Sequence, residues 1–195
     1  MEALFLSACL VALAEIGDKT QLLAFLLAAR FKKPIPIIIG ILVATVINHS
    51  IAGFVGAWIT SHVDPVMLRW VLGGSFIAMA IWTLIPDEIE EDEKIIASHF
   101  GVFGATAITF FLAETGDKTQ VATVAMAAHY SEPVFVVVGT TIGMLIADIP
   151  AVFVGDKFAS KIPMRIVHAV ASTLFVGLGA ATIAGVGQSF FQRSL

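Results

Sequence analysis

The sequence predicts an all-α polytopic membrane protein, with six transmembrane helices arranged as two inverted three-helix repeats. Three observations support this prediction. Hydrophobic residues make up 58% of the 195 and charged residues only 13%, a composition that suits lipid as the solvent for most of the chain. Six apolar segments are long enough to cross a bilayer. The second half of the chain also repeats the first.

The six predicted spans are separated by connections that contain Pro and charged residues. Each span exceeds the roughly 20 helical residues that the hydrocarbon core requires. The spans cover residues 2–29, 35–60, 66–86, 100–128, 133–155 and 164–191. Residues 87–99 are rich in carboxylates, which we interpret as a solvated linker. The chain therefore divides into a first repeat (1–86), the acidic linker and a second repeat (100–195), which together form one membrane domain.

The internal repeat has an offset of 99 residues, since Glu15 recurs as Glu114. Residues 13–21 read LAEIGDKTQ and residues 112–120 read LAETGDKTQ, with one difference in nine positions. The same offset pairs many positions outside the motif, among them Pro34 with Pro133, Gly40 with Gly139 and Gly56 with Gly155. Because each half holds three spans, an odd number, the second half must enter the membrane from the opposite side. Such inverted repeats are typical of secondary transporters.

Lys and Arg are distributed unevenly between the two sides of this topology. The first, third and fifth connections hold seven of them, whereas the other side, termini included, holds two. The side that is richer in Lys and Arg is normally cytoplasmic. We therefore expect both termini to lie outside the cell and the acidic linker to lie in the cytoplasm.

Four carboxylates of the repeated motif fall near the middle of the first and fourth spans. An ionisable residue at that depth costs about 2.5 to 3.5 kcal/mol on insertion scales, so it indicates a functional site. On a continuous helix, Glu15, Asp18 and Gln21 would lie on one arc of about 120°. The equivalent residues of the second repeat are Glu114, Asp117 and Gln120. The pseudo-twofold axis would bring both arcs together at the midplane as one cage of carboxylate and amide oxygens.

A cage of this kind suits a hard or borderline divalent cation such as Ca²⁺, Mn²⁺ or Mg²⁺. Zinc and copper usually bind His or Cys, which both motifs lack. With both motif lysines protonated, the four carboxylates leave a net charge of −2, which one divalent cation or two protons would neutralise. The sequence therefore predicts a transporter, not an enzyme, that exchanges a divalent cation for protons without a cofactor. The formal charge of −4 and the scattered basic residues exclude a nucleic-acid partner.

The remaining polar residues of the motif have alternative interpretations. Lys19 and Lys118 follow the glutamates at the i+4 position, so each could form an intrahelical ion pair that is only structural. An apolar pair would serve that purpose without the insertion cost. Thr20 and Thr119 would lie about 140° from the glutamates on a continuous helix, where we expect them to bond backbone or pack between helices, although their hydroxyls could reach a bent site. We therefore rank both threonines below the glutamines as ligands.

Glycines and other polar residues of the spans complete the candidate set. Gly17 and Gly116 would allow either a close helix approach or a local break that frees backbone carbonyls. Asn48 lies in the second span as a supporting candidate, beside His49, which we interpret as a bundle histidine with its ring nitrogens satisfied. The offset places Asp148 of the fifth span opposite His49. Asp148 is a candidate for a proton relay or an outer ligand.

At these two motifs the chain closely resembles the family of six-span cation/proton antiporters that carry a doubled Glu-x-Gly-Asp-Lys/Arg-Thr/Ser signature. The matching residues are Glu15, Gly17, Asp18, Lys19 and Thr20, and then Glu114, Gly116, Asp117, Lys118 and Thr119. The resemblance covers essentially the whole chain and implies export of Mn²⁺ or Ca²⁺ from the cytoplasm, coupled to proton entry. The chain looks like the bacterial manganese-exporting branch, which implies residence in the cell (inner) membrane.

Two other classes of function compete with this interpretation. A proton-coupled exporter of a small organic solute could share the three-plus-three plan, but an amino acid needs groups for its ammonium and its carboxylate. An intramembrane aspartyl protease uses two aspartates that share a proton. A lysine follows each motif aspartate here and would hold both aspartates ionised.

Overall fold

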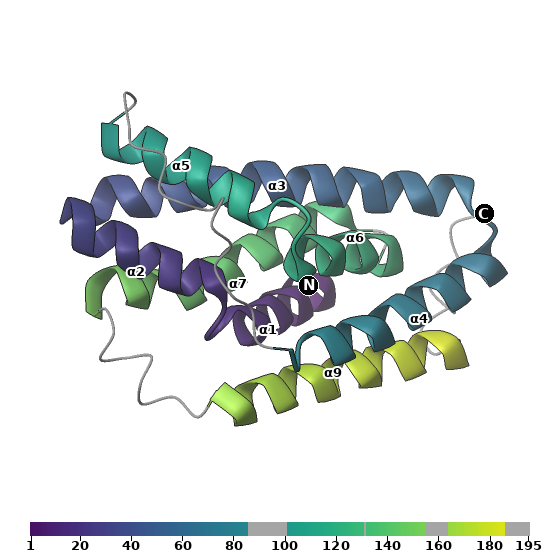
Figure 1. Cartoon of the computed structure of the whole chain (residues 1–195). Coiled ribbons are helices and arrows are strands. Elements are labelled where there is room, and N and C mark those ends of the chain that lie inside the picture. The colour runs from purple at the N-terminus through teal and green to yellow at the C-terminus, as the bar shows by residue number, and fades with distance from the viewer. Residues whose placement is uncertain (86–100, 131, 155–163, 186–195) are drawn as a thin grey trace.

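The computed structural model describes residues 1–85, 101–130, 132–154 and 164–185, and every regular element in this part of the chain is an α-helix (Figure 1). The helices of the first half are α1 (Glu2–Glu15), α2 (Lys19–Phe31), α3 (Pro34–His62) and α4 (Pro65–Trp82). Those of the second half are α5 (Gly101–Glu114), α6 (Lys118–Tyr130), α7 (Pro133–Val154) and α9 (Met164–Ala184). The acidic linker, 87–99, lies outside the described residues.

Four of the described helices are long and apolar enough to cross a membrane: α3, α4, α7 and α9. They correspond to the second, third, fifth and sixth predicted spans. A proline occupies the first position of α3, α4 and α7, where its fixed φ favours the helix and its missing N–H leaves no bond unmade. The predicted end of the sixth span, at residue 191, lies beyond the described residues.

The first and fourth predicted spans are each divided into two helices, so of the two possibilities that Gly17 and Gly116 left open, the local break is the one found. The α1 helix ends at Glu15 and α2 begins at Lys19, while α5 ends at Glu114 and α6 begins at Lys118. Gly17 and Gly116 have φ values of 87° and 85°, a left-handed conformation that glycine adopts without a steric cost. The glycine follows the end of one helix, and the next helix begins at the motif lysine, four residues after the glutamate.

Each divided helix packs on the long helix of the other half of the chain. The α1 helix lies against α7 and α5 lies against α3, while α2 contacts α7 and α6 contacts α3. The α4 and α9 helices pack side by side along one flank (Figure 1). The same partners therefore recur when the halves are exchanged, as expected for a duplicated fold.

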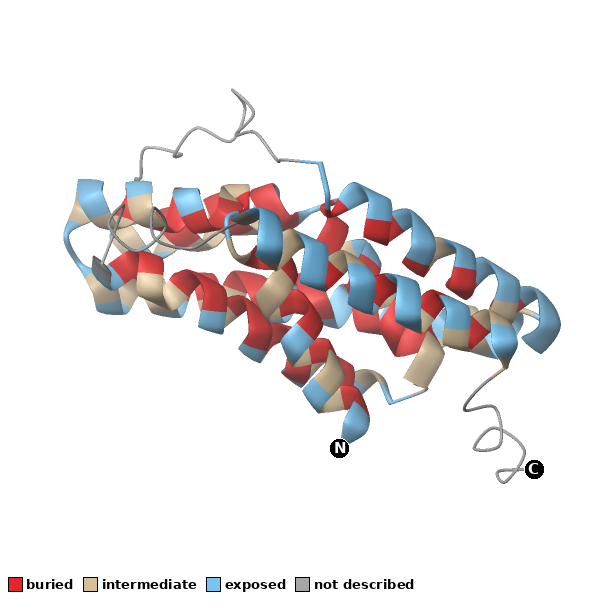
Figure 2. Ribbon diagram, turned by 90° about the horizontal axis from the view of Figure 1, so that it is seen from below, coloured by how far each residue is buried: buried red, intermediate tan, exposed pale blue. Residues whose placement is uncertain are grey.

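Burial is concentrated between the helices, whereas the outward faces are exposed (Figure 2). Many of these exposed side chains are large and apolar, among them Phe54, Trp58, Ile81 and Phe153. The buried positions, by contrast, include several ionisable groups. An all-helical chain with an apolar outside and a partly charged inside is compatible with a polytopic membrane protein.

Candidate metal centre at the two helix breaks

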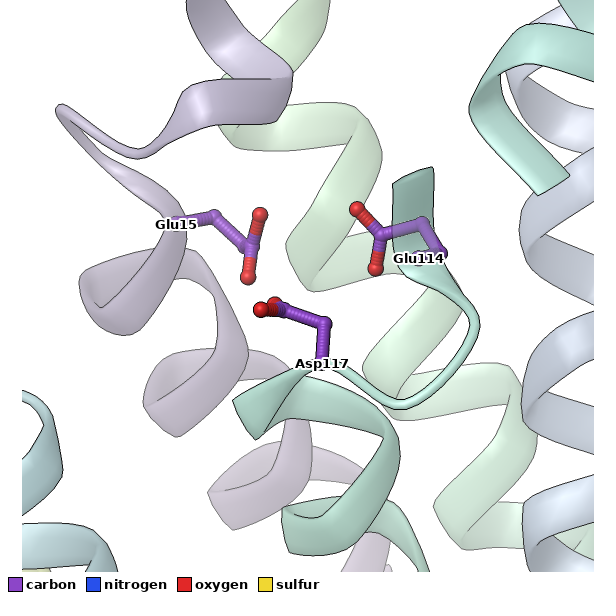
Figure 3. A group of neighbouring side chains, drawn as sticks. All are labelled: Glu15, Glu114 and Asp117. Atoms are coloured by element: carbon purple, nitrogen blue, oxygen red, sulfur yellow. The ribbon is translucent and has the colours of Figure 1, made fainter. Parts of the chain in front are cut away.

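Three carboxylates from the two motifs meet where the divided helices are interrupted. Glu15, Glu114 and Asp117 each offer an oxygen, and these oxygens all lie within 4.8 Å of one another. Figure 3 shows the three side chains pointing toward a common point from both halves of the chain. The glutamates are fully buried, and Glu15 Oε1 and Glu114 Oε1 have no hydrogen-bond partner. Buried carboxylates cannot remain so close without protons or a cation between them.

The helix breaks determine how each glutamate is held. Glu15 is the last residue of α1, and its Oε2 accepts a 2.7 Å hydrogen bond from the hydroxyl of Thr20 in α2. Thr119 in α6 donates in the same way to Glu114 Oε2, at 3.1 Å. The periodicity of a continuous helix places these threonines away from the glutamates, whereas a bent site leaves their hydroxyls within reach. The break interrupts the helical periodicity, and each threonine hydroxyl thereby meets the glutamate that precedes it. One oxygen of each glutamate is therefore fixed, and the other is left for a ligand.

The motif lysines form ion pairs between the two halves of the chain. Lys118 Nζ lies 3.0 Å from Asp18 Oδ2, and Lys19 Nζ lies 3.8 Å from Asp117 Oδ1. The proposed i, i+4 helical pairing with the glutamates does not apply, because each lysine begins a new helix after the break. The pairs are also unequal, since 4% of the Lys118 side chain is exposed and 15% of the Lys19 side chain.

The glutamines and Asn48 are hydrogen-bonded to backbone. Gln21 Oε1 accepts from the Gly17 amide at 3.0 Å, and Gln120 Oε1 accepts from the Gly116 amide at 2.7 Å. These bonds satisfy amides that the break removes from the helix. Asn48 Nδ2 donates to the Phe111 carbonyl at 3.0 Å. The glutamine oxygens therefore stabilise the breaks in this structure, and their role as metal ligands stays a prediction.

Asp148 of α7 is a buried carboxylate that lies outside the two motifs. It is fully buried and neither of its oxygens has a hydrogen-bond partner. The neighbouring Ala147 carbonyl accepts a 2.9 Å bond from Gln21 Nε2, which ties this turn of α7 to the first break. His49, the equivalent residue of α3, is buried as well, but neither ring nitrogen has a hydrogen-bond partner, so the prediction of a satisfied histidine is wrong. A relay role for Asp148 stays a prediction.

His168 of α9 also lies in this region, although the sequence pattern did not predict it. Its Nε2 atom lies 3.2 Å from the carbonyl oxygen of Ile16, which the first helix break exposes. A histidine near the start of an apolar helix is a weak signal in a sequence. The repeat adds one further clue, because the offset places Arg69 of α4 at the equivalent position.

Comparison with known proteins identifies the family to which this arrangement belongs. The family model described as "Divalent cation/proton antiporter GDT1" matches residues 3–91 and 102–189. The chain is a member of the GDT1 family. A relative from Vibrio cholerae named "Putative manganese exporter" is 48% identical over 183 residues, which are 93% of this chain and 90% of that protein. No solved structure matches the chain.

Plant members of the GDT1 family are more distant. The GDT1-like protein 3 of Oryza sativa subsp. indica is 29% identical over 205 residues, covering 93% of this chain and 73% of the rice protein. The Arabidopsis thaliana protein of the same name is 28% identical over 206 residues, covering 93% and 70%. GDT1 proteins are cation/proton antiporters and not enzymes, which confirms the predicted class of function and argues against the protease interpretation. They transport the cation as a substrate, and no cofactor is expected.

Proposed function

We propose that the chain exports Mn²⁺, or alternatively Ca²⁺, from the cytoplasm in exchange for protons. The observation that carries this proposal is the meeting of Glu15, Glu114 and Asp117 within 4.8 Å, buried, with an unbonded oxygen on each glutamate. Oxygen ligands of this kind suit Mn²⁺ and Ca²⁺. The name of the Vibrio cholerae relative favours Mn²⁺ between the two.

The four motif carboxylates and two motif lysines supply the charge for the exchange. Their net charge of −2 is neutralised by one divalent cation or by two protons. The ion pairs Lys118–Asp18 and Lys19–Asp117 engage the aspartates, so the glutamates are the groups best placed to give up protons when the cation arrives. Asp18, Gln21 and Gln120 remain candidate ligands in another step of the cycle. Asp148 would pass protons to or from the glutamates.

The membrane arrangement that we propose has six spans in two inverted repeats. The α1–α2 and α5–α6 pairs would each form one interrupted span, which brings both breaks to the midplane. The end of α1 would then present backbone carbonyls to the cation, and the start of α2 would favour the aspartate. The distribution of Lys and Arg favours termini outside the cell, in the inner membrane of a bacterium.

Proton movement in proteoliposomes tests this proposal directly. Purified protein is reconstituted with a pH-sensitive dye inside the vesicles, and Mn²⁺, Ca²⁺, Mg²⁺ or Zn²⁺ is added outside. We expect Mn²⁺ to drive the fastest proton release, followed by Ca²⁺, with protein-free vesicles as the control. If protein that is shown to be folded gives no proton flux with any of the four metals, the proposal is overturned.

The threonine that holds each glutamate gives a second prediction. Replacing Thr20 by Val keeps the volume of the side chain but removes the hydroxyl that donates to Glu15. We expect Mn²⁺ affinity to fall about tenfold, as is usual when a partner that orients a ligand is removed. Thr20→Ser, which keeps the hydroxyl, should retain most of the affinity. Calorimetric titration with Mn²⁺ measures both.

The matched control for this prediction is Thr173→Val. Thr173 is exposed on α9 and its hydroxyl donates only to the carbonyl of Ala169, one turn away. Its replacement should leave Mn²⁺ affinity unchanged. Equal effects at both threonines would show that the Thr20 hydroxyl does not act through the glutamate.

A further inference from the structure

The helices at the centre of the bundle contact each other in two equivalent places, neither of which has room for a side chain. A Cβ atom added at Gly40 of α3 would lie 2.7 Å from Thr106 Cβ of α5. At the equivalent Gly139 of α7, a Cβ would collide with Ser7 and the Leu4 carbonyl of α1. Close backbone packing of this kind permits little sliding. The α1, α3, α5 and α7 helices therefore form one rigid, twofold body.

The α4 and α9 helices form a second rigid body of their own. A Cβ at Gly73 of α4 would collide with Ile183 of α9, and one at Gly179 of α9 would lie 2.9 Å from the Gly73 carbonyl oxygen. Phe76 and Phe175, which the offset of 99 residues relates, stack with their ring centroids 6.5 Å apart. The two helices thus meet at their own pseudo-twofold axis and can move only together.

The α4–α9 pair docks on only one of the two equivalent surfaces of the central body. The α9 helix packs on α1 and α4 packs on α6, whereas the equivalent contacts, α4 with α5 and α9 with α2, are marginal at most. Figure 1 shows this pair lying alongside α1 and α6 and away from α2. A duplicated protein that uses one of two matching surfaces has the second available for another conformation.

Specific contacts at the used surface have equivalents that are not formed here, although two of the residues concerned, Thr83 and Phe175, are buried beside α1 and α6 in this docked state. Thr182 of α9 is hydrogen-bonded to His129 of α6 at 3.3 Å, and Phe76 of α4 meets the His129 ring edge-on at 5.8 Å between centroids. At the offset of 99 residues, the equivalents of Thr182, Phe76 and His129 are Thr83, Phe175 and Arg30, respectively. Arg30 is exposed and lies over the ring of its neighbour Phe31, so its guanidinium is free to approach Phe175 when the pair moves.

The α9 and α4 helices also differ in how they contact the two helix breaks. His168 of α9 reaches the carbonyl of Ile16 at the first break. Its equivalent, Arg69 of α4, has a buried Nε atom with no hydrogen-bond partner. The equivalent acceptor is the carbonyl of Thr115 at the second break. A buried donor without a partner is costly, and exchange of the docking surface would provide its acceptor.

We propose that the α4–α9 pair is the moving element of the transporter. It exchanges between docking on α1 and α6, as here, and docking on α5 and α2 through Arg30, Thr83 and Phe175. Because α1 begins and α6 ends on the face where the N-terminus lies, the present structure is the state closed on that face. The pair carries His168 away from the first break and Arg69 toward the second, which couples the motion to the metal centre. This inference rests on the proposed antiport, which requires two such states.

Cysteine cross-linking tests the motion without measuring transport. In a Cys9→Ser background, which removes the one native cysteine, two pairs are compared: His129→Cys with Thr182→Cys, and Arg30→Cys with Thr83→Cys. We expect a short bifunctional reagent to link the first pair in resting protein and the second pair only in the minor state. Each single-cysteine variant gives the background yield.

A further substitution shifts the balance between the two states. His129→Ala removes one hydrogen bond and one ring contact from the docked state, so the other state should gain about tenfold in population. The yield of the Arg30–Thr83 link should rise severalfold. A yield that stays at background in His129→Ala, in protein that still moves protons with Mn²⁺, would overturn the moving pair and leave the antiport intact. A rise without any metal-driven flux would keep the motion and overturn the antiport.

Discussion

Glu114→Gln is expected to weaken Mn²⁺ binding by about 30-fold or more and to abolish Mn²⁺-driven proton flux. The substitution keeps the shape of the side chain and an oxygen that can accept from Thr119, but it removes one charge from a buried group of three carboxylates. Loss of one member of a buried charge pair costs about 2 to 5 kcal/mol. Calorimetric titration measures the affinity, and the pH dye in proteoliposomes measures the flux.

The control for this prediction is Glu132→Gln, because Glu132 is exposed. Its side chain lies in the connection before α7, outside the buried site. The variant should bind Mn²⁺ and move protons as the unmodified protein does. Full Mn²⁺ affinity in Glu114→Gln would mean that the three carboxylates are not the metal centre.

Lys118→Gln is expected to destabilise the protein by about 3 to 5 kcal/mol, the usual cost of breaking a buried ion pair. The amine lies 3.0 Å from Asp18 and both side chains are almost completely buried. Lys19→Gln should cost clearly less, because its pair is longer, at 3.8 Å, and its side chain is more exposed. Thermal unfolding in detergent, followed by circular dichroism, compares the two variants.

A double-mutant cycle separates the ion pair from other effects of these substitutions. If Lys118 and Asp18 stabilise each other, Lys118→Gln combined with Asp18→Asn should be destabilised by less than the sum of the single changes. Coupling of about 0.5 to 3 kcal/mol is normal for contacting groups. Additive effects would contradict a direct pair between the two halves of the chain.

The pairing between halves has a mechanical consequence for the site. Each motif supplies an aspartate to the lysine of the other motif, so both ion pairs hold the two halves of the chain together at the breaks. The lengths and exposures of the two pairs differ although the motifs are nearly identical in sequence. This inequality agrees with the one-sided docking of α4 and α9, since both break the twofold symmetry of the repeats.

The sequence by itself determined the helical membrane character, the duplication and the identity of the charged positions. Lipid is the solvent for most of the chain, and a helix satisfies all its backbone hydrogen bonds internally within lipid. This explains the apolar composition and the length of α3, α4, α7 and α9. Glu15 and Glu114 stand out for the same reason, since a charge at such depth is costly without a function. A motif that recurs at a fixed offset also predicted that two sites would be equivalent.

Only the tertiary structure decided which motif residues bond to the backbone and which lie in the metal centre. The positive φ of Gly17 and Gly116 interrupts each helix and changes the orientation of the residues that follow, so Thr20 and Thr119 meet the glutamates. Periodicity assumes a continuous helix and therefore misplaces every residue after the break. Two features depend on contacts between residues that are far apart along the chain. One is the carboxylate group of Glu15, Glu114 and Asp117, and the other is the docking of α4 and α9 on one surface. Such contacts depend on how rigid helices pack, which no local pattern encodes.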